Sequence, residues 1–208
     1  MNPAQKIAHI LAILTHPVFV VIWLASILFT CSFYMNEWLP SYYVWRLSFP
    51  IIASVALVLL LSLIAWQTKI YAALQEKSSR QFLLGIYLIV FFFLFMNYRN
   101  TSLPSFYVDY LFLSLLYALG GWILLFKWNC SFHVLGWAGM LFTLIFYQWF
   151  YDVDLIHWII FSAIMTGFVA SLRLFQNVHT QEEILRSIFV SLGIFVLSIC
   201  CKSLNFWP

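Results

Sequence analysis

Apolar residues fill most of the chain in long continuous runs, and Pro, Asn and charged residues separate one run from the next. Each run approaches the roughly 20 residues that a helix needs to cross the hydrocarbon core of a bilayer. The runs are continuous instead of alternating with a period of two, which favours helices over a β-barrel. They cover residues 17–34, 44–66, 81–97, 106–126, 133–151, 155–175 and 184–203. The pattern predicts an all-α, polytopic transmembrane helix bundle of about seven helices, or six if the short third run is only partly inserted.

The first 16 residues have a different pattern, because polar residues interrupt them and their apolar side chains share one helical face. That face consists of Ile7, Ile10, Leu11 and Leu14. A short amphipathic helix of this kind is typical of a membrane interface. With Lys6 as its only Lys or Arg and no small-x-small cleavage site, the segment is expected to be retained and not removed as a signal peptide. We therefore divide the chain into an interfacial segment, 1–16, and one transmembrane helical domain, 17–208.

The composition excludes an ordinary soluble domain. Hydrophobic residues make up 64% of the chain and charged residues 8%, against roughly 45–50% and about 25% in soluble proteins. The formal net charge of +3 is too small to indicate a nucleic-acid partner. The four cysteines show neither a CxxC pair nor metal-ligand spacing, so we infer no disulfide framework, metal or cofactor from them. Membrane lipids are the expected partners.

Alternating crossings place distant polar segments on the same face of the membrane. One face holds residues 1–16, the loop 67–80, and the turns 127–132 and 176–183. This face, which we call the histidine end, receives three imidazoles and a guanidinium: His16, His133, His179 and Arg173. Ionisable groups at this depth are costly unless they are paired or functional. The histidine end is therefore the candidate site.

The distribution of basic residues leaves the orientation open. Seven of the ten Lys and Arg residues lie on or near the histidine end, and the positive-inside rule would make it cytoplasmic. Four of the seven are also candidates for an anion site: Lys77, Arg80, Lys127 and Arg173. Without them the count is three against three, which favours neither orientation.

Two short motifs carry a family resemblance. The segment Arg173-Leu-Phe-Gln-Asn-Val-His179-Thr-Gln-Glu-Glu183 fits R-x5-H-x3-[D/E]. It resembles the third signature of the type 2 phosphatidic acid phosphatase superfamily, S-R-x5-H-x3-D. The earlier Cys130-Ser131-Phe132-His133 resembles the second signature, P-S-G-H. The order of the motifs and their shared membrane face are similar to those of compact bacterial members, so the resemblance implies a core of that type in a bacterial inner membrane.

The resemblance implies a role for each matched residue. His179 would attack phosphorus as a neutral imidazole, and Glu183 would orient its ring. His133 would protonate the leaving oxygen. Arg173 would clamp two phosphate oxygens with its planar fork. The anion would be held further by Ser131 with nearby backbone amides, and by the positive field of Lys77, Arg80 and Lys127. This chemistry needs no metal.

The chain also departs from the family pattern. The first signature, K-x6-R-P, is absent, because Lys77-Ser-Ser-Arg80 has neither its spacing nor its proline. Cys130 and Phe132 replace the Pro and Gly of the second signature. Ser171 lies one residue too early for the third signature, in which Glu183 replaces Asp. Weakened or lost activity is therefore a live alternative.

The sequence hypothesis is a membrane-embedded phosphatase that hydrolyses a lipid phosphate or pyrophosphate through a phosphohistidine. The alternative is a catalytically silent relative that binds lipid or serves as a subunit of a larger membrane complex, and the missing first signature favours it. Haem ligation by two histidines is less favoured, because no pair has suitable helical spacing.

Two further polar groups receive structural interpretations. Asp152, Asp154 and His157 form D-x-D-x2-H on the opposite face, which is weak evidence for a cation site, and we favour a polar capping turn with Asp154 as the N-cap of the sixth predicted helix. Arg99 and Asp109 are expected to pair across the loop 98–105.

Overall fold

The computed structural model describes residues 3–31, 77–99 and 105–204, and helices occupy most of these ranges. The helices are α1 (Pro3–Leu14), α2 (Pro17–Cys31), α6 (Lys77–Tyr98), α7 (Ser105–Lys127), α8 (Phe132–Tyr151), α9 (Ile156–Phe175) and α10 (Gln181–Ser203). No strand occurs in the described ranges. The all-α prediction is therefore confirmed for this part of the chain.

Four helices, α7 to α10, are long and apolar enough to cross a membrane. Their boundaries follow the predicted runs closely, since α8 covers Phe132–Tyr151 and α9 covers Ile156–Phe175. Shorter apolar segments lie in α2, at Phe19–Leu28, and in α6, at Leu84–Tyr98. The predicted run 44–66 lies outside the described residues. The count of seven crossings and the phosphatase-like core stay predictions.

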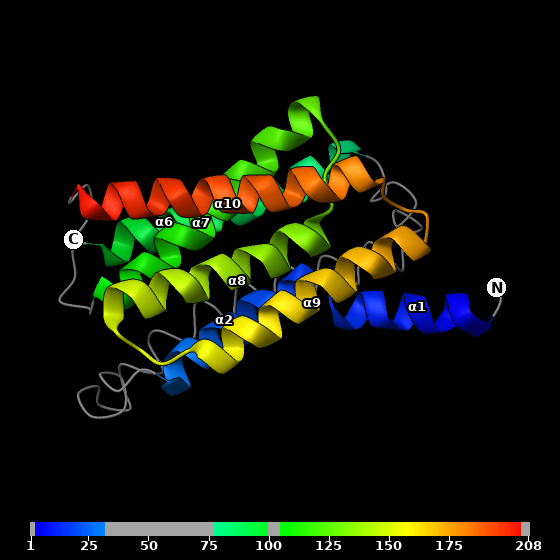
Figure 1. Ribbon diagram of the computed structural model, residues 1–208. Helices are drawn as coiled ribbons and strands as arrows, with labels where there is room; N and C mark the ends of the chain where they lie inside the picture. Colours follow the sequence, from blue (N-terminus) through cyan, green and yellow to red (C-terminus); the bar gives the residue numbers. More distant parts are fainter. Residues whose placement is uncertain (1–2, 32–76, 100–104, 205–208) are drawn as a thin grey trace.

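Helix α8 lies at the centre of the bundle and packs against α2, α7, α9 and α10, while α6 packs against α7 (Figure 1). Its residues Val134, Leu144, Phe146 and Tyr147 are fully buried. Gly136 brings the start of α2 close, because a Cβ there would meet the Pro17 side chain at 3.0 Å. This close approach sets the segment before α2 beside the start of α8.

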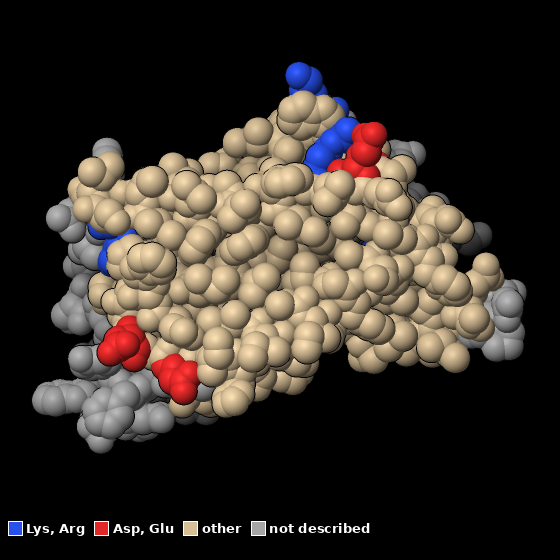
Figure 2. All heavy atoms as spheres, viewed as in Figure 1, with Lys and Arg blue, Asp and Glu red and all other residues tan. Residues whose placement is uncertain are grey.

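Charged side chains gather towards the two ends of the bundle, and Figure 2 shows a broad band between them without Lys, Arg, Asp or Glu. Large apolar side chains are exposed in this band, among them Phe161, Ile164 and Phe168 of α9. An exposed apolar surface of this extent would be unfavourable in water. It is the surface that a chain presents to lipid.

A buried ion pair joins α7 and α10 at the end of the bundle opposite to the histidine end. The fully buried carboxylate of Asp109 on α7 accepts from Lys202 of α10, with Nζ 3.2 Å from Oδ1 and 3.1 Å from Oδ2. The Tyr151 hydroxyl donates to Oδ2 at 2.6 Å. We expected Arg99 as the partner of Asp109, and within the described residues the ion pair is instead with Lys202.

The turn before α9 also differs in detail from the prediction. The N-cap of α9 is Leu155, not Asp154. Asp154 still contributes, because its Oδ1 accepts from the Ile156 backbone N–H at 3.2 Å. Asp152, which ends α8 with φ of 51°, adopts the left-handed conformation that Asp tolerates better than most residues. Asp152 and Asp154 therefore stabilise the turn that connects α8 to α9.

Candidate functional site at the histidine end

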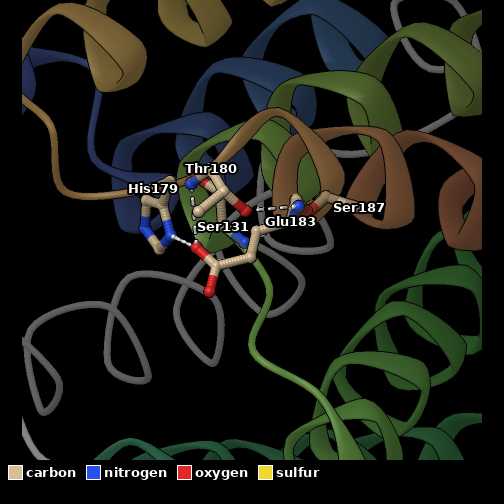
Figure 3. A network of polar contacts seen from close by, with 5 residues as sticks. All are labelled: Ser131, His179, Thr180, Glu183 and Ser187. Carbon is tan, nitrogen blue, oxygen red and sulfur yellow. Dashed lines mark hydrogen bonds and ion pairs between the residues drawn. The ribbon is translucent and has the colours of Figure 1, made fainter.

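The turn between α9 and α10 carries the pair that the third motif predicts. Asn177 reverses the chain with φ of 54°, and Thr180 is the N-cap of α10. The Nδ1–H of His179 donates to Glu183 Oε2 at 2.9 Å, and the His179 side chain is only 9% exposed (Figure 3). Because a carboxylate oxygen accepts, the proton lies on Nδ1, and a neutral ring then carries its lone pair on Nε2. The geometry matches a ring-orienting role for the carboxylate.

The same carboxylate belongs to a capping box. Glu183 Oε2 accepts from the Thr180 backbone N–H at 3.2 Å, and Thr180 Oγ1 accepts from the Glu183 N–H at 3.3 Å. Glu183 therefore holds His179 and stabilises the first turn of α10 at once.

A serine contact joins the start of α10 to the start of α8. Ser187, one turn after Glu183, donates to the Glu183 carbonyl at 2.8 Å and accepts from the Ser131 backbone N–H at 2.9 Å (Figure 3). Ser131 is the N-cap of α8 in backbone conformation, but its hydroxyl makes no capping bond. Within the described residues this buried hydroxyl has no hydrogen-bond partner. The Ser131 hydroxyl is thus buried at the start of α8, two residues before His133, and its anion contact stays a prediction.

His133 lies in the first turn of α8 and faces the segment before α2. Its Nε2 lies 3.1 Å from the Ala12 carbonyl, and because a carbonyl only accepts, Nε2 carries the proton. The ring meets that of His16 edge to face, with centroids 5.2 Å apart. Trp137, one turn further along α8, donates to the Thr15 carbonyl at 3.1 Å. The start of α8 therefore holds the end of α1 and the residues that follow it.

Arg173 lies in the last turn of α9, where a chain of two hydrogen bonds connects it to α1. Its Nη1 donates to Gln176 Oε1 at 2.8 Å, and Gln176 Nε2 donates to the Ala8 carbonyl at 2.7 Å. The two bonds fix the orientation of the Gln176 amide, because its oxygen faces the guanidinium and its nitrogen faces the carbonyl. Gln176 therefore links the predicted phosphate clamp to the N-terminal helix.

The ring of His133 contacts that of His16 and lies within electrostatic reach of Arg173 and His179, so these four groups share one environment. Burial by the surrounding helices and then the charge of Arg173 lower the pKa of His16 from 6.5 to about 4, although solvent still reaches an edge of the ring. His16 is therefore neutral at pH 7. The structure brings together the imidazoles and the arginine that alternation of the crossings predicted.

The remaining predicted cations are placed differently. Lys127 ends α7 in an exposed position, with its Nζ 4.9 Å from the centroid of the Trp128 ring. Leu124 and Leu125, in the last turn of α7, pack with Phe132 of α8 and Val190 of α10, whereas Lys127 itself is exposed. Lys77 and Arg80 lie in the first turn of α6 and not in a loop, because the helix begins four residues before the predicted run. Their side chains lie outside the described residues, and their role stays a prediction.

Sequence reasoning missed the residues that connect the site to its surroundings. Gln176 was not singled out, and no local pattern marks it, because its partner on α1 is 168 residues away. Ser187 had a detectable signal. Together with Ser191 and Ser198 it forms a buried small-polar stripe on α10 at helical spacing, which indicates a face packed against another helix. Ser191 donates to the Leu135 carbonyl of α8 at 3.3 Å, as that stripe would predict.

No family model, no curated protein and no solved structure matches this chain. The resemblance to the type 2 phosphatidic acid phosphatases therefore rests on the residues quoted for it. The argument for a functional site at the histidine end depends on the arrangement of its residues: an oriented imidazole, an arginine and a second histidine lie at one end of a helical bundle.

Proposed function

We propose that the protein is a membrane-embedded phosphatase that hydrolyses a lipid phosphate or pyrophosphate through a phosphohistidine, in the manner of the type 2 phosphatidic acid phosphatases. The observation that carries the proposal is the 2.9 Å bond between His179 Nδ1 and Glu183, at the same end of the bundle as Arg173 and His133. An imidazole held in this way is a competent nucleophile at neutral pH.

In the proposed reaction, the Nε2 lone pair of His179 attacks phosphorus and the bond from phosphorus to the lipid oxygen breaks. With the anionic substrate bound, His133 acts as the imidazolium: it keeps its Nε2–H on the Ala12 carbonyl and gives its Nδ1 proton to that oxygen, so the lipid leaves as an alcohol and His179 carries the phosphoryl group. Water then attacks phosphorus and loses a proton to His133, and the phosphorus–nitrogen bond breaks. Inorganic phosphate is released and both imidazoles return to their starting states.

The anion is stabilised by groups that surround this position. Arg173 binds two of the equatorial oxygens, where charge is spread as the ester bond breaks. The Ser131 hydroxyl and the first-turn backbone N–H groups of α8 donate to a third oxygen, at the positive end of the helix dipole. Lys77, Arg80 and Lys127 raise the local positive potential. The broad apolar surface of the bundle suits a substrate that arrives through a bilayer, which we propose to be a bacterial inner membrane.

The decisive experiment measures release of inorganic phosphate by the purified protein in nanodiscs. The substrates are phosphatidic acid, phosphatidylglycerophosphate, a polyprenyl pyrophosphate and lipid A phosphates. His179→Ala should abolish release, and His157→Ala, an exposed histidine at the start of α9, is the matched control that should retain it. Trapped phosphoenzyme should be acid-labile and base-stable. Absence of phosphate release by the wild type on every substrate would overturn the enzyme proposal.

A silent relative, binding lipid or serving as a subunit of a membrane complex, is the second candidate. This candidate is favoured because the side chains of Glu183 and His133 already form hydrogen bonds within the protein. Glu183 Oε2 belongs to the capping box of α10, and His133 Nε2 donates to the Ala12 carbonyl. In that case His179→Ala would lower the stability of the protein and change no turnover.

A further inference from the structure

Helix α1 has two faces of different character. Its inner face carries Ala8 and Ala12, which are buried against Leu172 of α9. Its outer face carries three large apolar side chains that are more than half exposed: Ile7, Ile10 and Leu14. At 3.6 residues per turn the two sets lie on roughly opposite sides of the helix. The helix also projects beyond this end of the bundle (Figure 1).

The inner face supplies backbone acceptors to the candidate site. Three side chains donate to carbonyls on this side of the segment: Gln176 to Ala8, His133 to Ala12 and Trp137 to Thr15. Small side chains at positions 8 and 12 allow the backbone to come within hydrogen-bonding distance. The Ala12 and Thr15 carbonyls lie at or after the end of α1, where intrahelical partners are missing, whereas the mid-helix Ala8 carbonyl accepts from Gln176 with its second lone pair. The position of α1 therefore sets the positions of His133 and Gln176.

We propose that α1 lies in the headgroup boundary of this protein's own membrane, with Ile7, Ile10 and Leu14 in the lipid, and that this contact holds the site side chains in place. We assign the outer face of α1 to the bilayer because α1 packs on α9. Of the four helices that could cross a membrane, α9 is the most exposed. Phe168 and Phe175 of α9 are exposed as well. The apolar surface of α1 thus continues the lipid-facing surface of α9.

Gln176 is the positioning residue in this arrangement. Its amide oxygen accepts from Arg173 and its amide nitrogen donates to α1, so displacement of α1 removes one of the two anchors of the amide. His133 would lose its carbonyl acceptor at the same time. The effect of this positioning on phosphate binding rests on the proposed function, whereas the placement of α1 in the lipid does not.

The placement is tested with single-cysteine variants in nanodiscs of phosphatidylethanolamine and phosphatidylglycerol. The native cysteines are first replaced by serine: Cys31, Cys130, Cys200 and Cys201. A fluorescent probe on Ile7→Cys or Ile10→Cys should be quenched by nitroxide-labelled lipid severalfold more than the same probe on Gln5→Cys, an exposed position on the other side of α1. Equal quenching at the three positions would overturn the proposal.

The coupling is tested by hydrogen exchange of residues 131–137 and 173–180 in the same nanodiscs, which requires no turnover. Ile10→Glu should speed exchange in both segments, because a carboxylate does not stay among lipid tails. Gln5→Glu adds the same charge to α1 away from the apolar face and should leave exchange unchanged. Unchanged exchange in Ile10→Glu would show that lipid contact does not hold the site.

The role of Gln176 is tested by vanadate binding. Gln176→Leu removes both hydrogen bonds and should weaken vanadate binding about tenfold, as loss of a group that orients a ligand does. Gln176→Glu keeps an acceptor for Arg173 but loses the donor to Ala8 and places a negative charge beside the anion, so it should bind vanadate no better than Gln176→Leu. Equal affinity in Gln176→Leu and the wild type would overturn the positioning role. If the wild type neither binds vanadate nor releases phosphate, the proposed function and the positioning role fall together, while quenching and exchange still decide the placement of α1.

Discussion

The two ends of the bundle both carry buried polar groups, but their charges balance differently. At one end the single carboxylate of Asp109 has an ammonium partner in Lys202 and a hydroxyl donor in Tyr151. At the histidine end, Arg173 and three imidazoles lie near the carboxylate of Glu183, which bonds to His179, while Glu182 pairs separately with Arg186. A balanced pair needs nothing further from outside, whereas neutral imidazoles beside an arginine can still take up a proton when an anion binds. The contrast separates a structural cluster from a candidate site.

The surroundings of the two clusters support the same distinction. Asp109 lies within an aromatic cluster in which Phe106 contacts both Tyr147 and Tyr151, with ring centroids 4.5 and 5.1 Å apart. This packing excludes water and gives the carboxylate fixed donors. At the histidine end, the first turns of α8 and α10, whose backbone N–H groups lack helical partners, lie beside imidazoles and Arg173 instead of an aromatic cluster. Donors for a ligand are therefore concentrated there.

The largest effect is expected at the balanced end. Lys202→Met should lower the free energy of unfolding by about 3–5 kcal/mol, because it leaves the fully buried carboxylate of Asp109 without its counter-ion. The double variant Lys202→Met/Asp109→Leu should recover much of this loss, since it removes both charges. Thermal unfolding in detergent measures both, and vanadate binding at the other end should not change. Equal losses in the single and double variants would contradict a balanced pair.

At the histidine end, two substitutions should separate chemistry from helix capping. Glu183→Gln keeps the capping box, because Gln also serves at its third helical position, but it removes the charge that orients His179. We expect phosphate release to fall about 100-fold with little change in stability.

Thr180→Ala is the control for Glu183→Gln, because it should disrupt the helix cap and leave the charge of Glu183 in place. It should lower the free energy of unfolding by about 1 kcal/mol through loss of the cap, with phosphate release retained. Thermal unfolding and phosphate release are measured on both variants. If both lose stability and neither loses activity, Glu183 is only a capping residue.

The smallest effect concerns His16. Its pKa in the folded protein is lowered from 6.5 to about 4, so the unfolded chain binds more protons between these values. Stability should therefore be constant above pH 6.5 and should fall as the pH decreases from 6.5 towards 4. We expect a loss of about 1 kcal/mol at most, because solvent reaches the ring. His16→Asn should reduce the change in the free energy of unfolding between pH 6.5 and 4. If the pH dependence is unchanged, other groups cause the loss of stability in acid.

The sequence by itself determined the local features of this protein. Continuous apolar runs fixed the long helices to within a few residues, because the length and composition of a spanning segment follow from the thickness of a bilayer. The spacing of His179 and Glu183 also predicted their contact, because His179 directly precedes the N-cap of α10 and the Glu183 side chain, in the first turn, reaches back towards that end. The start of α6 was the exception, and there Lys77 and Arg80 extend the helix beyond its apolar run.

The tertiary structure alone decided which groups meet across the bundle. Asp109 pairs with Lys202, which is 93 residues away, and Gln176 bonds to a carbonyl on α1. Neither contact could be predicted, because a helix that is apolar on all sides gives no pattern from which its rotation or its neighbours follow. The acceptor for His133 is a backbone carbonyl, a group that every residue carries and that no side-chain pattern distinguishes. These contacts are therefore determined by how the helices pack against one another.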